Sequence, residues 1–92
     1  MSQEDPAAAE REFRSLLEWD DDSPQGYAGL AQALLQQGKF EAAGEAAAEA
    51  IGLRFDLPVA HLTLGEALVR LGSGEEATRA FESCLTLRPD FV

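Results

Sequence analysis

Residues 22–55 read DSPQGYAGLAQALLQQGKFEAAGEAAAEAIGLRF, and residues 56–89 read DLPVAHLTLGEALVRLGSGEEATRAFESCLTLRP. Aligned without a gap, the two stretches share 11 identical residues, which recur at an offset of 34 throughout. A fixed period of this length is typical of stacked helix pairs, in which each repeat buries its apolar face against its neighbours. The repeat therefore indicates an all-α antiparallel helix-pair solenoid rather than a single-core enzyme.

Five helices are expected in the chain, and no strand pattern competes with them. Apolar residues recur at helical spacing, and the connections between the periodic segments are short, so helices adjacent in sequence should lie antiparallel. The expected helices cover approximately residues 6–19, 23–37, 40–53, 58–71 and 73–87.

The helix ends carry recognisable signals. Asp5 and Ser23 are N-cap residues that precede a proline, which fits the first helical position. Gly38 should end its helix in a left-handed conformation, and Gly72 closes the equivalent helix one repeat later. Ser73-Gly74-Glu75-Glu76 has the spacing of a capping box, and Arg88-Pro89 should end the last helix.

The chain of 92 residues carries a net charge of −10, and its first 23 residues hold eight acidic and two basic side chains. Such a surface repels a phosphate backbone, which excludes nucleic acid as an expected partner. The acidic front is either a docking patch for a basic partner or a solvated surface that aids solubility. The sequence contains no signal peptide and no membrane-length apolar segment, so a cytoplasmic protein is predicted.

Few single residues suggest chemistry. Cys84, the only cysteine, lies on an apolar helical stripe and is predicted to be a small buried packing residue. His61, the only histidine, should fill a bulky core position, and Trp19 should also be structural. No metal-ligand spacing, phosphate loop or nucleophile elbow is present, so neither a cofactor, a metal site nor catalytic residues are expected.

The second repeat resembles the sequence pattern of a known family. Its residues His61, Leu64-Gly65, Leu68, Gly72, Ala77, Phe81, Cys84 and Pro89 resemble the tetratricopeptide repeat pattern, with His61 at the large first position and Cys84 at a small one. Gly65 should allow the paired helix to cross closely. The first repeat is a looser match, with Ala31 in place of the glycine, Ala47 in place of the aromatic residue and Phe55 in place of the final proline.

The resemblance extends over nearly the whole chain, taken as a single domain of residues 1–92. Residues 6–19 match the second helix of a preceding repeat, because Ala9, Phe13 and Leu16 fall 34 residues before Ala43, Ala47 and Ala50. The expected organisation is half a repeat (6–19) followed by two full repeats (22–55 and 56–89). With no helix expected to cover either outer face, either the chain is a piece of a longer protein or two copies cover each other's open ends, and self-association through the terminal helices is the prediction.

The tetratricopeptide resemblance implies a non-catalytic scaffold that binds a peptide or partner helix in a concave groove lined by the first helix of each pair. The groove-facing positions are predicted to include Gln25, Gln32, Leu35, Gln36, Leu62, Glu66, Val69 and Arg70. Leu62 and Val69 could equally pack against a following helix. The cationic clamp of chaperone-binding members is absent, since the matching positions hold Ala28, Gln32, Thr63, Leu62 and Glu66, so an acidic C-terminal tail is a disfavoured ligand.

A second resemblance suggests an alternative function. Residues 50–61, AIGLRFDLPVAH, are similar to repeats in the tail of bacterial type I phosphodiesterases of the alkaline-phosphatase superfamily. This similarity implies an accessory or oligomerisation domain of a larger enzyme, whose catalytic residues have no counterpart here.

Overall fold

The computed structural model describes residues 5–88, and this part of the chain consists of five α-helices joined by short turns. The helices are α1 (Pro6–Trp19), α2 (Pro24–Gln36), α3 (Phe40–Leu53), α4 (Pro58–Arg70) and α5 (Gly74–Leu87). Every boundary lies within one residue of its expected position, which confirms the all-α helix-pair array. Pro89, expected to end the last helix, lies outside the described residues.

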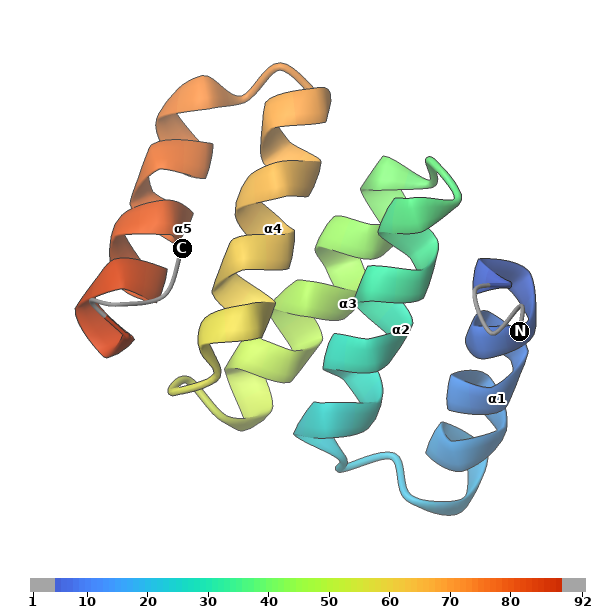
Figure 1. Ribbon diagram of the computed structural model, residues 1–92. Coiled ribbons are helices and arrows are strands. Elements are labelled where there is room, and N and C mark those ends of the chain that lie inside the picture. Colours follow the sequence, from blue (N-terminus) through green and yellow to red (C-terminus); the bar gives the residue numbers. More distant parts are fainter. Residues whose placement is uncertain (1–4, 89–92) are drawn as a thin grey trace.

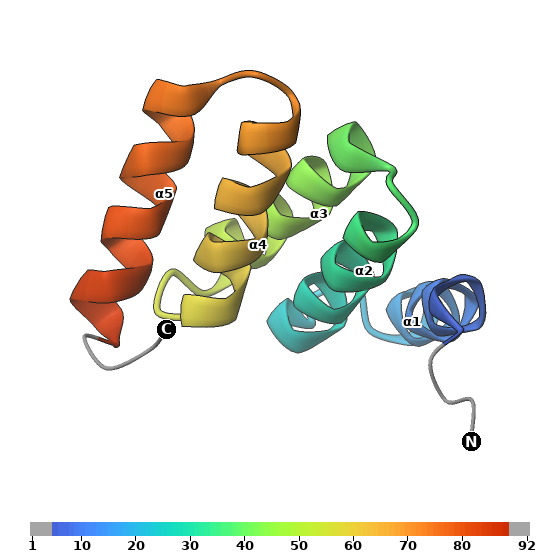
Figure 2. The same ribbon diagram turned by 45° about the horizontal axis from the view of Figure 1, so that its top comes forward.

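The helices form a single curved row. Figure 1 shows α1 and α5 at opposite ends of the array with the other three helices between them, and Figure 2 shows the same order from a tilted view. Each helix packs against its neighbours in sequence, and α2 also contacts α4, whereas α3 and α5 make no contact within the described residues. Because the first helices of successive pairs lie closer together than the second helices, α2 and α4 form the inner side of the curve.

The core consists mainly of alanine, which allows the helices to approach closely. Leu30 and Leu34 of α2 are the large apolar residues of this core, and Phe13, Leu17 and Leu64 pack against it from its edge. Ten alanines are buried, namely Ala31, Ala33, Ala43, Ala46, Ala47, Ala50, Ala60, Ala67, Ala77 and Ala80.

Two helices begin at side-chain caps, as predicted. One carboxylate oxygen of Asp5 accepts hydrogen bonds from the backbone N–H groups of Ala7 (3.1 Å) and Ala8 (3.3 Å). The Ser23 hydroxyl accepts a hydrogen bond from the Gly26 N–H at 2.9 Å. Both caps satisfy N–H groups that have no partner inside their own helix.

Tight glycine turns end α2 and α4. Gly38 and Gly72 have φ values of 80° and 85°, the left-handed conformation predicted for Gly38. The Ser73 N–H donates to the Leu68 carbonyl at 2.9 Å and the Gly72 N–H to the Val69 carbonyl at 3.1 Å, which together make a Schellman motif. The same motif recurs 34 residues earlier in the turn around Gly38.

The predicted capping box at Ser73 and Glu76 is wrong. Ser73 makes no side-chain hydrogen bond to the first turn of α5. In a capping box the side chain of the third helical residue would accept the N–H of the cap residue, but the Ser73 N–H already bonds to Leu68. The Schellman motif that ends α4 therefore removes the donor that Glu76 would need.

Two glycines admit a phenylalanine ring to the surface of a neighbouring helix. A Cβ atom at Gly65 would lie 2.5 Å from Cε1 of Phe81, and one at Gly29 would lie 2.3 Å from the ring of Phe13. These distances are far below normal van der Waals contact. The close approach expected at Gly65 is thus confirmed, and the group that approaches is the ring of Phe81.

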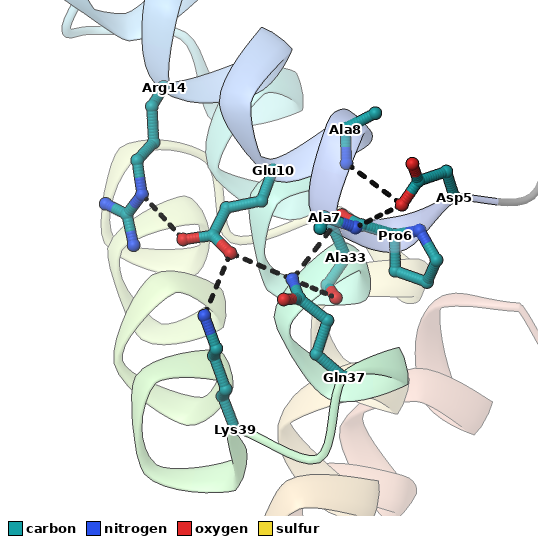
Figure 3. A network of polar contacts seen from close by, with 9 residues as sticks. All are labelled: Asp5, Pro6, Ala7, Ala8, Glu10, Arg14, Ala33, Gln37 and Lys39. Carbon is teal, nitrogen blue, oxygen red and sulfur yellow. Dashed lines mark hydrogen bonds and ion pairs between the residues drawn. The ribbon is translucent and has the colours of Figure 1, made fainter.

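Helix α1 is held to the array by a polar network as well as by partly buried apolar residues (Figure 3). The Glu10 carboxylate accepts hydrogen bonds from Gln37 Nε2 (2.8 Å) and Arg14 Nε (2.8 Å), and Lys39 Nζ lies at 3.3 Å. The hydrogen bond from Gln37 and then that from Arg14, with a further contribution from Lys39, lower the Glu10 pKa from 4.5 to about 2. The network ties the outermost helix to the turn between α2 and α3.

The apolar stripes are less buried at the two ends of the array than the sequence suggested. Leu16 of α1 and Leu85 of α5 are 44% and 46% exposed, and Trp19 is 90% exposed. The prediction that Trp19 has a structural role is therefore wrong. Helix α1 contacts only α2 among the described helices, so only one side of α1 is covered.

Candidate functional site

Five of the eight predicted groove residues surround one cavity of about 480 Å³. Leu35 and Gln36 come from the last turn of α2, and Glu66, Val69 and Arg70 come from the second half of α4. Leu35 and Gln36 correspond to Val69 and Arg70 at the 34-residue offset, so the stacking of the two pairs brings these positions together. Val69 is 53% exposed, which leaves an apolar side chain available at the opening.

The other three predicted residues lie elsewhere on the same two helices. Gln25 and Gln32 on α2 are exposed, and Leu62 on α4 is half-buried. None of them lines this cavity. The cavity is formed near the C-terminal ends of α2 and α4. Gln25 and Leu62 lie nearer the N-terminal ends of these helices, whereas Gln32 lies in the second half of α2 but does not line the cavity.

The cavity is also lined by three residues that were not predicted from the sequence, namely Gly38, Phe40 and Phe81. Phe40 is the first residue of α3 and follows the tight turn at Gly38, which places it beside the end of α2. Phe81 reaches the cavity because Gly65 leaves room for its ring on α4. The sequence signals that could have identified these residues were the three-residue connection before Phe40 and the 16-residue spacing from Gly65 to Phe81.

The cavity combines apolar lining residues with separate charged and amide groups. The Arg70 guanidinium lies 5.5 Å from the centroid of the Phe40 ring, within the range of a cation–π interaction. Arg70 and Glu66 form no ion pair with each other, although one helical turn separates them. Arg70, Glu66 and Gln36 can therefore offer donors and acceptors to a ligand that lies against Val69 and Leu35.

The two chemically distinctive buried residues are structural. His61 is 3% exposed, and its Nε2 lies 2.7 Å from the Phe55 carbonyl oxygen, to which it donates because a carbonyl can only accept. The Phe55 ring packs edge-on against the imidazole at 4.8 Å. Cys84 is also 3% exposed, and burial raises the pKa of its thiol. Both residues fill the core positions that the sequence predicted.

Residues 5–88 have the features of neither a metal site nor a membrane-spanning helix. No cluster of three or more His, Cys, Asp or Glu side chains in residues 5–88 could hold a metal ion. None of the five helices combines the length and the apolar character needed to cross a membrane.

Comparisons with known proteins agree with this architecture. A tetratricopeptide repeat family model matches residues 1–56, and a second one matches residues 59–91. Among solved structures, the crystal structure of MamA superposes with a TM-score of 0.88 at 26% identity, covering 94% of this chain and 50% of that one. The structure MamA MSR-1 C2 gives a TM-score of 0.82 at 24% identity, with 91% and 48% coverage.

This chain thus spans about half the length of both solved chains. A search of curated protein sequences gave no match. The two family models together cover almost all of residues 1–92, and the fold has the paired helices that the family requires. The chain belongs to the tetratricopeptide repeat family.

Proposed function

We propose that this chain is a protein-interaction module that binds an extended peptide or a helix of a partner protein at the inner side of α2 and α4. The family and the fold support a protein-interaction scaffold. The observation that carries the finer proposal is the convergence of five groove residues on one cavity. The proposed role is binding alone and requires no catalytic group.

The chemistry of the cavity suggests how a peptide would be held. An apolar side chain of the partner would lie against Val69 and Leu35 in the cavity, which the rings of Phe40 and Phe81 also line. Aromatic and apolar surface provides most of the free energy of such contacts, and the polar groups fix the orientation of the ligand. Gln36 can bond to the partner's backbone, while Arg70 and Glu66 can bond to polar side chains.

A charge-neutral double substitution tests binding at the inner side of α2 and α4, with Val69 at the cavity and Leu62 outside it. Leu62→Arg with Val69→Glu places two charges on the inner helices, and both positions tolerate them sterically because neither residue is fully buried. The variant should keep the helical circular dichroism spectrum and the unfolding temperature of the parent. It should lose the proteins that the parent retains in an affinity pull-down analysed by mass spectrometry.

The matched control is Ala48→Arg with Thr86→Glu, which introduces the same two charges at exposed positions of α3 and α5. This control should retain the partner. Retention of the same partner by the inner-helix variant, or its loss from the control alone, would show that binding occurs elsewhere.

A further inference from the structure

The only tryptophan of the chain lies almost fully exposed at the end of α1. Trp19 is 90% exposed, and Leu16, one helical turn earlier, is 44% exposed. An aromatic side chain such as tryptophan removes roughly 150–250 Å² from water when it becomes buried. The array therefore leaves its largest apolar side chain outside the core, and it buries the neighbouring Leu16 only in part.

The same end of α1 carries negative charge that opposes helix formation. Glu18, Asp20, Asp21 and Asp22 are all exposed, and residues 15–23 contain no cationic side chain. The C-terminus of a helix is the negative end of its dipole, so carboxylates there are unfavourable. Large apolar side chains are normally buried, and carboxylates are normally absent from the C-terminus of a helix. Natural proteins depart from such local preferences mainly at functional sites, and this end of α1 departs from both.

The nearby cations are engaged or distant. Arg14 bonds to Glu10 at 2.8 Å, and Lys39 lies 3.3 Å from the same carboxylate. Arg11 lies two helical turns before Trp19. Within the carboxylate group the one internal bond is donated by the Asp22 N–H to Asp20 Oδ1, at 3.1 Å. The charge around Trp19 is therefore available to a cationic partner.

We propose that Trp19, Leu16 and the four carboxylates of Glu18, Asp20, Asp21 and Asp22 form a second interaction surface, the tryptophan surface, which binds a basic segment of a partner protein. A lysine or arginine of that segment would lie over the indole, the best aromatic acceptor for a cation–π interaction. Its neighbouring cations would pair with the carboxylates, and an apolar side chain would cover Leu16.

This surface is separate from the proposed groove, because α1 contributes no residue to the cavity between α2 and α4. The net charge of −10 favours a basic partner over an acidic one at long range as well. The tryptophan surface would allow the chain to hold two partners at once, which suits a scaffold.

The test uses the full chain and a defined probe, the acetylated peptide Lys-Leu-Lys-Leu-Lys, with Glu-Leu-Glu-Leu-Glu as the control peptide. Since Trp19 is the only tryptophan, its emission reports on this surface alone. The basic peptide should shift or quench the emission in a saturable way, and added salt should weaken its binding because exposed charges are screened. The acidic peptide should leave the emission unchanged.

Two variants separate the tryptophan surface from general electrostatics, with binding followed by anisotropy of a labelled basic peptide. Trp19→Ala should weaken binding about fivefold. Neutralising Glu18, Asp21 and Asp22 to their amides should weaken it about tenfold. The matched control neutralises Glu75, Glu76 and Glu82 of α5, which makes the same change in net charge and should alter affinity less than twofold.

Three results would overturn the proposal. Equal loss of affinity in the two neutralised variants would mean that only net charge matters. If Trp19→Ala bound the basic peptide with unchanged affinity, the indole would not be part of the contact. A shift of the emission with protein concentration alone, without peptide, would show that a second copy of the chain covers this surface.

Discussion

Replacing Gly72 by alanine should destabilise the array even though the added methyl group has room. No atom lies within 4 Å of the position that a Cβ would occupy, so the cost comes only from the φ of 85°. A left-handed conformation costs a residue with a Cβ about 1–2 kcal/mol. The lower entropy of alanine in the unfolded chain returns roughly 0.4–1 kcal/mol. The expected net loss is about 1 kcal/mol, and Gly38→Ala should behave in the same way.

Gly52 provides a control of opposite sign. It lies in the last turn of α3, has no atom within 4 Å of an added Cβ, and does not have a positive φ. Gly52→Ala should therefore stabilise the chain by about 0.5 kcal/mol. Thermal unfolding followed by circular dichroism at 222 nm should show Gly72→Ala melting about 4–8 °C below the parent and Gly52→Ala slightly above it. Equal melting temperatures for the two variants would refute the assignment of the left-handed turn.

Three further predictions concern packing, pH and reactivity. Gly65→Ala should cost about 1–3 kcal/mol in urea unfolding because its methyl group collides with the Phe81 ring, and a Phe81→Leu background should recover part of that loss; an unaffected single variant would contradict the close contact. Because the folded-state pKa of Glu10 is lowered to about 2, its carboxylate contributes stability that is complete above about pH 4.5 and is lost as the pH falls toward 2. The difference in unfolding free energy between the parent and Glu10→Gln should shrink over that range, and a difference independent of pH would exclude the network as its source. Cys84 should react with a thiol reagent only at the rate at which the array opens, since the thiol is buried and its pKa is raised; reaction as fast as in urea would show that the packing of α5 against α4 does not protect it.

The fold followed from the sequence because several helix ends carry explicit signals. Proline after a cap residue starts α1 and α2, and glycine with a positive φ ends α2 and α4. The 34-residue offset then fixed which helices stack. The sequence did not predict all side-chain hydrogen bonds correctly. The capping box at Ser73 was expected from its spacing, but the Ser73 N–H that it requires bonds to Leu68 in the turn that ends α4.

The exposure of Trp19 could not be deduced from periodicity. An apolar stripe shows which side of a helix faces its neighbours, but it does not show how many neighbours there are. Helix α1 has one, so residues near the edge of its stripe remain exposed. The position of the residue at the very end of the helix adds to this effect.

The site was predictable to the level of the helix but not of the cavity. Family spacing placed all eight residues on α2 and α4, where the structure has them. Which of these residues line the cavity depends on how the helix pairs α2–α3 and α4–α5 pack against each other. The same packing brings the rings of Phe40 and Phe81 to the cavity. The organisation into half a repeat and two full repeats, and the similarity of residues 50–61 to a phosphodiesterase tail, stay predictions.

Site-specific photocrosslinking tests the central claim, binding at the inner groove, most directly. A benzoylphenylalanine would replace Val69, which lines the cavity and is 53% exposed, and in a second protein it would replace Thr86 on α5. The account predicts that a partner retained in the pull-down crosslinks to position 69 and not to position 86. Crosslinking at position 86 with none at position 69 would contradict it.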